Sequence, residues 1–371
     1  MKPLFPMLLL ITYLHGVFAS GFIPILNEQL GERANWAFAM YFVGLLLGQI
    51  AVYYFSSLSK HRYLFTFYEI LFALSFVYMG LFKGEMHLVI GRSLEGLAGG
   101  LATPLLFTSF ISAPSSLPPK DRIVRYNALF ALGYVTGPVI VEWTLNVFRN
   151  YAYTVFLLYF GLIFIAINLL MMPMLKKLDT HQNEEELRFK VLFEGHGWFE
   201  KFYSLFFTKC FYGFLMAFIT AYAASFFTKW PISAITVLIA IIFVAGQQLG
   251  ARTLHFFNKK SLEIMLPLAM GALLVVFWLT HSSILLLVVA ALHAYLTFIA
   301  FLNFTTQMKS GREFALFNSM SDPGMIIGAL LVGAGTHGVW VIAALGALPL
   351  LYWRQWPHLL KQAEPQAQET H

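Results

Sequence analysis

The residues of this chain whose types could do chemistry are charged side chains inside apolar segments. Arg92 and Glu95 lie three residues apart, a spacing that places both on one face of a helix. Glu142 and Asp322 each lie in a different apolar segment. Because burying a charge in lipid costs at least about 2.5 kcal/mol on insertion scales, all four residues are candidates for function.

Two interpretations of this set stay open. Arg92 could form a permanent structural ion pair with Glu95 or with Glu142. Alternatively, the four residues could bind and release protons, since burial favours the neutral form of a carboxyl group and a neighbouring arginine favours its charged form. A conformational change that shifts this balance would couple the set to a proton gradient.

Asp322 is followed directly by Pro323 and Gly324 in an apolar segment that begins near Phe314. At 1.5 Å per residue, the aspartate lies about 12 Å from the end of that segment. Proline frees a backbone carbonyl and glycine loosens a helix, so the triplet predicts a hinge or a broken helix beside a carboxylate. The alternative is a simple kink that Asp322 caps.

Several neutral or titratable side chains could line a substrate cavity. His15 and His293 titrate near physiological pH and could relay protons, although a lone histidine on an apolar face is more often structural. Asn303 and Gln247 could bind a substrate by hydrogen bonds, or could join helices.

Two further charges lie inside apolar segments. Lys209 is either a side chain that extends to the aqueous boundary or, if it faces a cavity, a residue that favours an anionic substrate. For Glu69 we expect an interhelical hydrogen bond.

Small residues cluster in one apolar segment as Gly133, Gly137 and Pro138. Glycines four residues apart allow two helices to approach closely, so we expect these residues to act mainly in helix packing.

The composition indicates where these segments must lie. The 371-residue chain is 59% hydrophobic and only 11% charged, with a mean hydropathy of +0.71. A soluble protein would carry about 25% charged residues, so this composition indicates a polytopic membrane protein. The single cysteine, Cys210, excludes an intramolecular disulfide.

Apolar segments near the length of about 20 residues that spans a bilayer occur twelve times. Spanning segments must be helical, because unpaired backbone groups are too costly in lipid. The expected spans are Leu4–Leu26, Ala34–Phe55, Tyr63–Phe82, His87–Ile111, Tyr126–Val147, Ala152–Met174, Tyr203–Phe227, Ile232–Gly250, Leu262–Leu279, Ser283–Gln307, Phe314–Gly335 and Val339–Trp353.

The basic residues predict the orientation of these spans. With a cytoplasmic amino terminus, 18 of the 24 lysines and arginines lie in cytoplasmic segments and four in outer loops. This bias places both termini in the cytoplasm. The apolar run after Lys2 is longer than that of a signal peptide, and we expect it to be retained as the first helix. The basic loops would meet lipid headgroups, and nucleic-acid binding is disfavoured.

The chain contains an internal repeat. The hexamer 125–130 (RYNALF) recurs as 312–317 (REFALF), at a spacing of 187 residues. Other matches between the halves lie at offsets of 197 to 199, and the difference falls in one longer, proline-rich loop at 113–125. Two homologous six-helix halves would give this pattern. The expected units are a bundle at 1–175, a cytoplasmic linker at 176–201, a second bundle at 202–356 and a cytoplasmic tail at 357–371.

Three motifs resemble those of the major facilitator superfamily. The segment 91–100 (GRSLEGLAGG) is similar to its fourth-helix motif, and 133–138 (GYVTGP) is similar to the core of the fifth-helix motif of its proton-coupled exporters. Val141 and Glu142 stand where that motif has two glycines. The loop 56–62 (SSLSKHR) keeps the basic end of a third motif and lacks its acidic residue.

This resemblance implies an all-α membrane protein whose twelve helices form two homologous six-helix bundles. It also implies a role in proton coupling for Arg92, the arginine of the fourth-helix motif. The implied function is proton-coupled export of a small organic solute by alternating access, as in drug, metabolite and siderophore exporters.

Other functions were weighed against export. Proton-coupled uptake of a metabolite or an anionic siderophore is the main alternative, and a membrane sensor that transports nothing is a remote one. The sequence has no phosphate-binding loop, nucleophile elbow or metal-ligand cluster, so we expect neither an enzyme nor a cofactor or metal. The expected setting is a monomer in a bacterial inner membrane, with a small-molecule substrate, protons and the lipid bilayer as partners.

Overall fold

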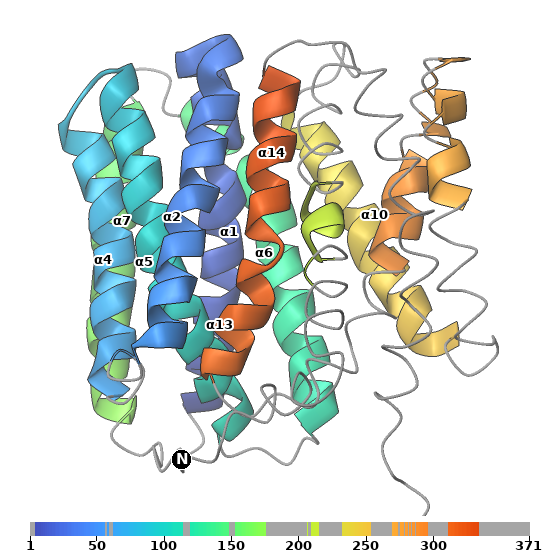
Figure 1. Cartoon of the computed structure of the whole chain (residues 1–371). Coiled ribbons are helices and arrows are strands. Elements are labelled where there is room, and N and C mark those ends of the chain that lie inside the picture. The colour runs from blue at the N-terminus through green and yellow to red at the C-terminus, as the bar shows by residue number, and fades with distance from the viewer. Residues whose placement is uncertain are drawn as a thin grey trace, which may run out of the picture.

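In a computed structural model of the chain, all the described elements are helices (Figure 1). The structure describes residues 4–55, 58, 62–113, 119–147, 153–175, 206, 209–214, 232–253, 269–273, 275–277, 279–280, 282, 284–285, 287–295 and 311–333. The helices are α1 (Leu4–Leu30), η1 (Gly31–Arg33), α2 (Ala34–Tyr54), α4 (Arg62–Leu81), α5 (Glu85–Ser112), α6 (Pro119–Val147), α7 (Tyr153–Leu175), α10 (Ile232–Thr253), α13 (Gly311–Ser319) and α14 (Asp322–Gly333).

Among the described residues, seven helices are long and apolar enough to cross a membrane. Six are α1, α2, α4, α5, α6 and α7, and the seventh is the stretch Gly311–Leu331, which α13 and α14 share. The expected spans in the first half therefore each correspond to a helix. The spans expected at 203–227, 262–279, 283–307 and 339–353 fall largely or wholly outside the described residues.

Two helix boundaries differ from the expectation. Helix α6 begins at Pro119 rather than near Tyr126, because the polar residues before Tyr126 continue the helix beyond the apolar run. Proline suits a first helical position, where its missing N–H group costs nothing. The segment expected at Phe314–Gly335 is interrupted, since α13 ends at Ser319 and α14 begins at Asp322.

The helices of the first half pack in pairs. Helix α1 lies along α6, α2 along α5, and α4 along α7 (Figure 1). The α1–α6 contact depends on Gly16 and Gly133, because a Cβ atom on Gly133 would lie 2.9 Å from the backbone nitrogen of Val17. Gly137 faces the same helix and approaches Gly21. The expected packing role of Gly133 and Gly137 thus agrees with their positions.

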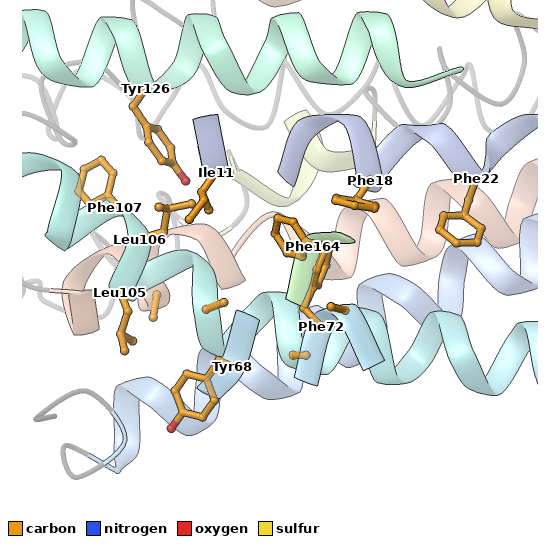
Figure 2. Close-up of a cluster of buried hydrophobic side chains, with 14 of the residues drawn as sticks. Ile11, Phe18, Phe22, Tyr68, Phe72, Leu105, Leu106, Phe107, Tyr126 and Phe164 are labelled. Carbon is orange, nitrogen blue, oxygen red and sulfur yellow. The ribbon is translucent and has the colours of Figure 1, made fainter. Parts of the chain in front are cut away.

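The core of this half is rich in phenylalanine. Figure 2 shows Phe18 of α1 above Phe72 of α4 and Phe164 of α7. The ring centroids of Phe18 and Phe164 are 4.8 Å apart, and those of Phe72 and Phe164 are 6.0 Å apart. These contacts hold three helices together around a region with little polar surface.

The two halves meet along two sets of helices. Helix α2 packs against α13 and α14, and α6 packs against α10, while the far end of α5 reaches α13. In Figure 1, α13 and α14 lie beside α2. Helix α2 therefore lies between α5, which carries Arg92 and Glu95, and α14, which carries Asp322.

The α1–α6 contact generates a test of stability. We expect Gly133→Ala to lower the melting temperature of the purified protein in detergent, because its new methyl group meets backbone atoms of α1 and overpacking costs about 1–3 kcal/mol. Gly99→Ala is the control, since its Cβ would find the ring of Phe72 at an ordinary 3.4 Å. Equal melting temperatures for the two variants would contradict this account of the packing.

Candidate functional site

The first part of the site is an ion pair on α5. Nη1 of Arg92 donates to Oε2 of Glu95 at 2.5 Å, and both side chains are at most 1% exposed. Of the two partners expected for Arg92, the structure therefore forms the pair with Glu95. Glu142 is half-buried and forms no ion pair with any described residue. Arg92 Nε and Glu95 Oε1 lack a hydrogen-bond partner among the described residues.

Aromatic rings surround the guanidinium group of Arg92. Its central carbon lies 4.3 Å from the ring centroid of Tyr41, 5.2 Å from that of Phe22 and 5.9 Å from that of Phe38. A cation over a desolvated aromatic face gains about 2 kcal/mol or more. These rings of α1 and α2 offset part of the cost of burying the ion pair and keep water from it.

The second part of the site is Asp322 at the start of α14. Helix α13 ends three residues earlier, and the N–H group of Ser321 bonds to the carbonyl of Asn318 at 2.9 Å in the turn between them. Asp322 is 2% exposed, and its Oδ2 has no hydrogen-bond partner among the described residues. The broken helix predicted from the proline and glycine after this residue is present.

Gly324 explains why this short helix lies so deep. A Cβ atom at this position would overlap the backbone carbonyl of Cys210, so only glycine allows the approach. Pro323 starts the new helix at a position where its missing N–H group is tolerated. The two residues together therefore position the carboxylate of Asp322 inside the protein.

Lys209 lies near this carboxylate. The lysine is 8% exposed, and its ammonium nitrogen lies 4.0 Å from the ring centroid of Phe317. Its charge and that of Asp322 act on each other electrostatically. Lys209 is therefore buried beside Phe317, and its place in a substrate cavity stays a prediction.

Tyr41 links the two parts of the site. Its side chain is buried, its ring lies against the guanidinium group of Arg92, and its hydroxyl group is within electrostatic range of Glu95 and Asp322. Tyr41 belongs to α2, the helix on which α14 packs. Helix α2 thus contacts both α5, which carries the Arg92–Glu95 pair, and α14, which carries Asp322.

Of the other site residues predicted from the sequence, the structure describes the side chains of the two histidines but not those of Asn303 and Gln247. His293 is buried, and its Nε2 lies 3.0 Å from the backbone carbonyl of Tyr212, as a structural histidine would. His15 lies 3.2 Å from Glu69, so the partner of this glutamate is a titratable side chain. Asn303 lies outside the described residues, as does the side chain of Gln247.

One end of the interface is closed by aromatic rings. Phe107 of α5 and Phe314 of α13 stack with centroids 3.8 Å apart and an angle of 11° between their planes. Tyr126 meets both rings edge-on (Figure 2 shows its position beside Phe107). Nε of Arg312 donates to the carbonyl of Tyr53 at 2.9 Å beside them.

Both copies of the repeated hexamer meet at this closed end. Tyr126 belongs to the first copy, while Arg312 and Phe314 belong to the second. Sequence reasoning identified the hexamers and assigned no role to their aromatic residues. The pairing of Phe107 with Phe314 carries no local sequence signal, because it joins residues from different halves.

A family model of the major facilitator superfamily matches residues 4–329. The chain belongs to this superfamily. It is therefore a multi-pass membrane protein and a secondary transporter of small solutes, not an enzyme. The expected all-helical membrane fold is confirmed. No curated protein sequence matches the chain.

Two solved structures of the major facilitator fold resemble the chain along nearly its whole length. A variant of the fucose:proton symporter FucP of E. coli aligns with a TM-score of 0.63 and 14% identity, covering 97% of each chain. The human organic anion transporter MFSD10 (TETRAN) aligns with a TM-score of 0.65 and 12% identity, covering 98% of this chain and 99% of its own. At these identities the likeness concerns the fold alone.

The buried pair of this transporter gives a second prediction. Arg92→Leu leaves Glu95 buried without its partner, and we expect a loss of about 3–5 kcal/mol of stability. The double variant Arg92→Leu with Glu95→Leu should recover most of that loss, because apolar replacement of both charges is often neutral. Thermal unfolding in detergent would check this, and a double variant less stable than the single one would contradict the assignment.

Proposed function

We propose that the protein is a proton-coupled antiporter that exports a small organic solute by alternating access. The observation that carries the proposal is that α2 packs between two buried charged groups, the Arg92–Glu95 pair of α5 and Asp322 of α14. Movement of one half against the other changes the distance between these groups. Such a change gives the carboxyl groups different proton affinities in the two conformations.

Alternating access requires that one end of the interface opens as the other closes. The stack of Phe107 on Phe314 and the bond from Arg312 to Tyr53 close the end predicted to be cytoplasmic. The break before Asp322 gives α13 and α14 a point at which to bend separately. We infer that this conformation is closed to the cytoplasm and that export requires the aromatic stack to separate.

The proposed direction of transport, export, is supported by features of α5 and α6. Their segments 91–100 and 133–138 resemble exporter motifs, and Gly133 and Gly137 pack tightly on α1. Tight packing at this position would prevent leakage along the α1–α6 contact. We place the protein in a bacterial inner membrane as a monomer with both termini in the cytoplasm.

Proton-coupled uptake of an anionic metabolite or siderophore is the second candidate. The buried ammonium group of Lys209 favours it, because a cation inside the interface region would attract an anionic substrate. The direction of flux distinguishes the two candidates. An anionic solute that accumulates inside cells when the protein is present would support uptake.

The test begins with metabolite profiles of cells with and without the gene, measured inside and outside, to identify the solute and the direction. That solute is then followed in vesicles containing the purified protein, under an imposed pH gradient. We expect Glu95→Gln to abolish movement driven by the gradient and to spare solute exchange between equal pH values. Glu142→Gln should also abolish driven movement, whereas Glu85→Gln, whose exposed carboxyl group pairs with Arg33, is the control and should retain it.

Two results would contradict the proposal. One is that no solute in a broad panel crosses the vesicle membrane although the protein is folded. The other is that Glu95→Gln and the wild type respond identically to the pH gradient, which would remove the pair from coupling.

Cross-linking tests the proposed movement. In a Cys210→Ser background, we expect Phe107→Cys with Phe314→Cys to form a disulfide under mild oxidation, because the two rings stack. The bond should block solute flux, and reduction should restore it. Phe107→Cys with Leu81→Cys is the control pair and should stay reduced. Full flux through the oxidised first pair would contradict opening at this end.

A further inference from the structure

A second pair of titratable side chains lies apart from the Arg92–Glu95 pair. Nε2 of His15 on α1 and Oε2 of Glu69 on α4 are 3.2 Å apart. Glu69 is completely buried and His15 is 4% exposed. Neither carboxylate oxygen of Glu69 has a well-aligned hydrogen bond to a described residue. The carboxyl group therefore depends on this one histidine.

The surroundings of the pair are apolar. The ring of His15 lies 4.4 Å from the ring centroid of Phe72 and 6.3 Å from that of Phe164. A lone carboxylate in such a shell is costly, whereas a pair that shares one proton is electrically neutral in either arrangement of that proton. Burial of Glu69 in this shell is therefore compensated only through its contact with His15 among the described residues.

The pair lies close to the Arg92–Glu95 pair. Helix α1, which carries His15, packs against α5, and His15 is within electrostatic range of Glu95. Other elements contribute few titratable groups nearby. Tyr126 of α6 is within electrostatic range of Glu69. Helix α7 contributes the neutral, buried amide of Asn168. The described part of α10, which touches α1, carries a single charge, Arg252 in its last turn.

We propose that His15 and Glu69 form a proton-binding site, in which His15 passes a proton between the interface site and the buried carboxyl group of Glu69. At 1.5 Å per residue, His15 lies roughly 16 Å along α1, near the middle of a bilayer about 30 Å thick. The proton moves from the histidine ring to the carboxylate and returns by the same route. This inference rests on the proposed function, because the His15–Glu69 pair would be a binding site for the proton that is coupled to transport.

Infrared difference spectroscopy of the full-length protein tests the proposal, with protons as the only ligand. The sample is titrated in lipid nanodiscs between about pH 5 and pH 9, the range in which a histidine pair is expected to respond. The measured signal is the C=O stretch of protonated carboxyl groups. We expect one titrating band in the wild type to be lost in Glu69→Gln.

The histidine is tested in the same way. In His15→Asn, we expect the band of Glu69 to titrate over a different pH range from that of the wild type, because the carboxyl group has lost the side chain it contacts. Glu85→Gln should leave the band unchanged and serves as the control, because the carboxyl group of Glu85 is exposed and pairs with Arg33. Size-exclusion profiles confirm that each variant is folded, and the wild-type titration needs no variant at all.

The outcomes separate this site from the proposed function. An unchanged band in Glu69→Gln, or a wild type with no titrating carboxyl band, would overturn the proton-binding site. Gradient-driven flux that survives in Glu69→Gln would overturn its part in coupling while leaving the antiporter intact. A band that disappears in Glu69→Gln of a protein with no proton-driven flux would support the site and contradict the antiporter.

Discussion

The cost of placing charges in a low-dielectric interior governs this structure. Arg92, Glu95, Glu69, Lys209 and Asp322 are all buried in helices of a membrane protein. Each is associated with an opposite charge, a titratable partner or an aromatic ring, because an isolated charge would cost several kcal/mol. The positions of these partners depend on helix packing, so any movement of the helices changes the electrostatic balance.

Close packing through glycine residues holds the helices of the first half together. The α1–α6 pair approaches through Gly16 and Gly133, which leaves no room for gradual sliding. Within the first half, phenylalanine contacts join α1, α4 and α7. The described contacts between the halves include an aromatic stack, a hydrogen bond from Arg312, and the packing of α13 and α14 on α2 and of α10 on α6. Rigid halves with a separable interface suit a transporter that alternates between two conformations.

Much of the fold follows from the sequence, since apolar length and the distribution of basic residues predict spans without knowledge of contacts. The broken helix at Asp322 was also predictable, because proline followed by glycine has a local effect on the backbone. Partner choice was harder to predict. Spacing on one helix identified Glu95 as a partner of Arg92, but the half-buried position of Glu142 depends on the rotation of α6. The pairing of Glu69 with His15 joins separate helices, so no spacing along the chain reveals it.

The central claim is that solute and protons compete through buried carboxyl groups at the interface between the halves. The most direct measurement is the pH change when the solute identified by metabolite profiling is added to purified protein in a lightly buffered solution. An antiporter of the proposed kind releases protons on binding the solute, and its affinity for the solute rises with pH. Solute binding without proton release, and with the same affinity across the pH range, would contradict the account.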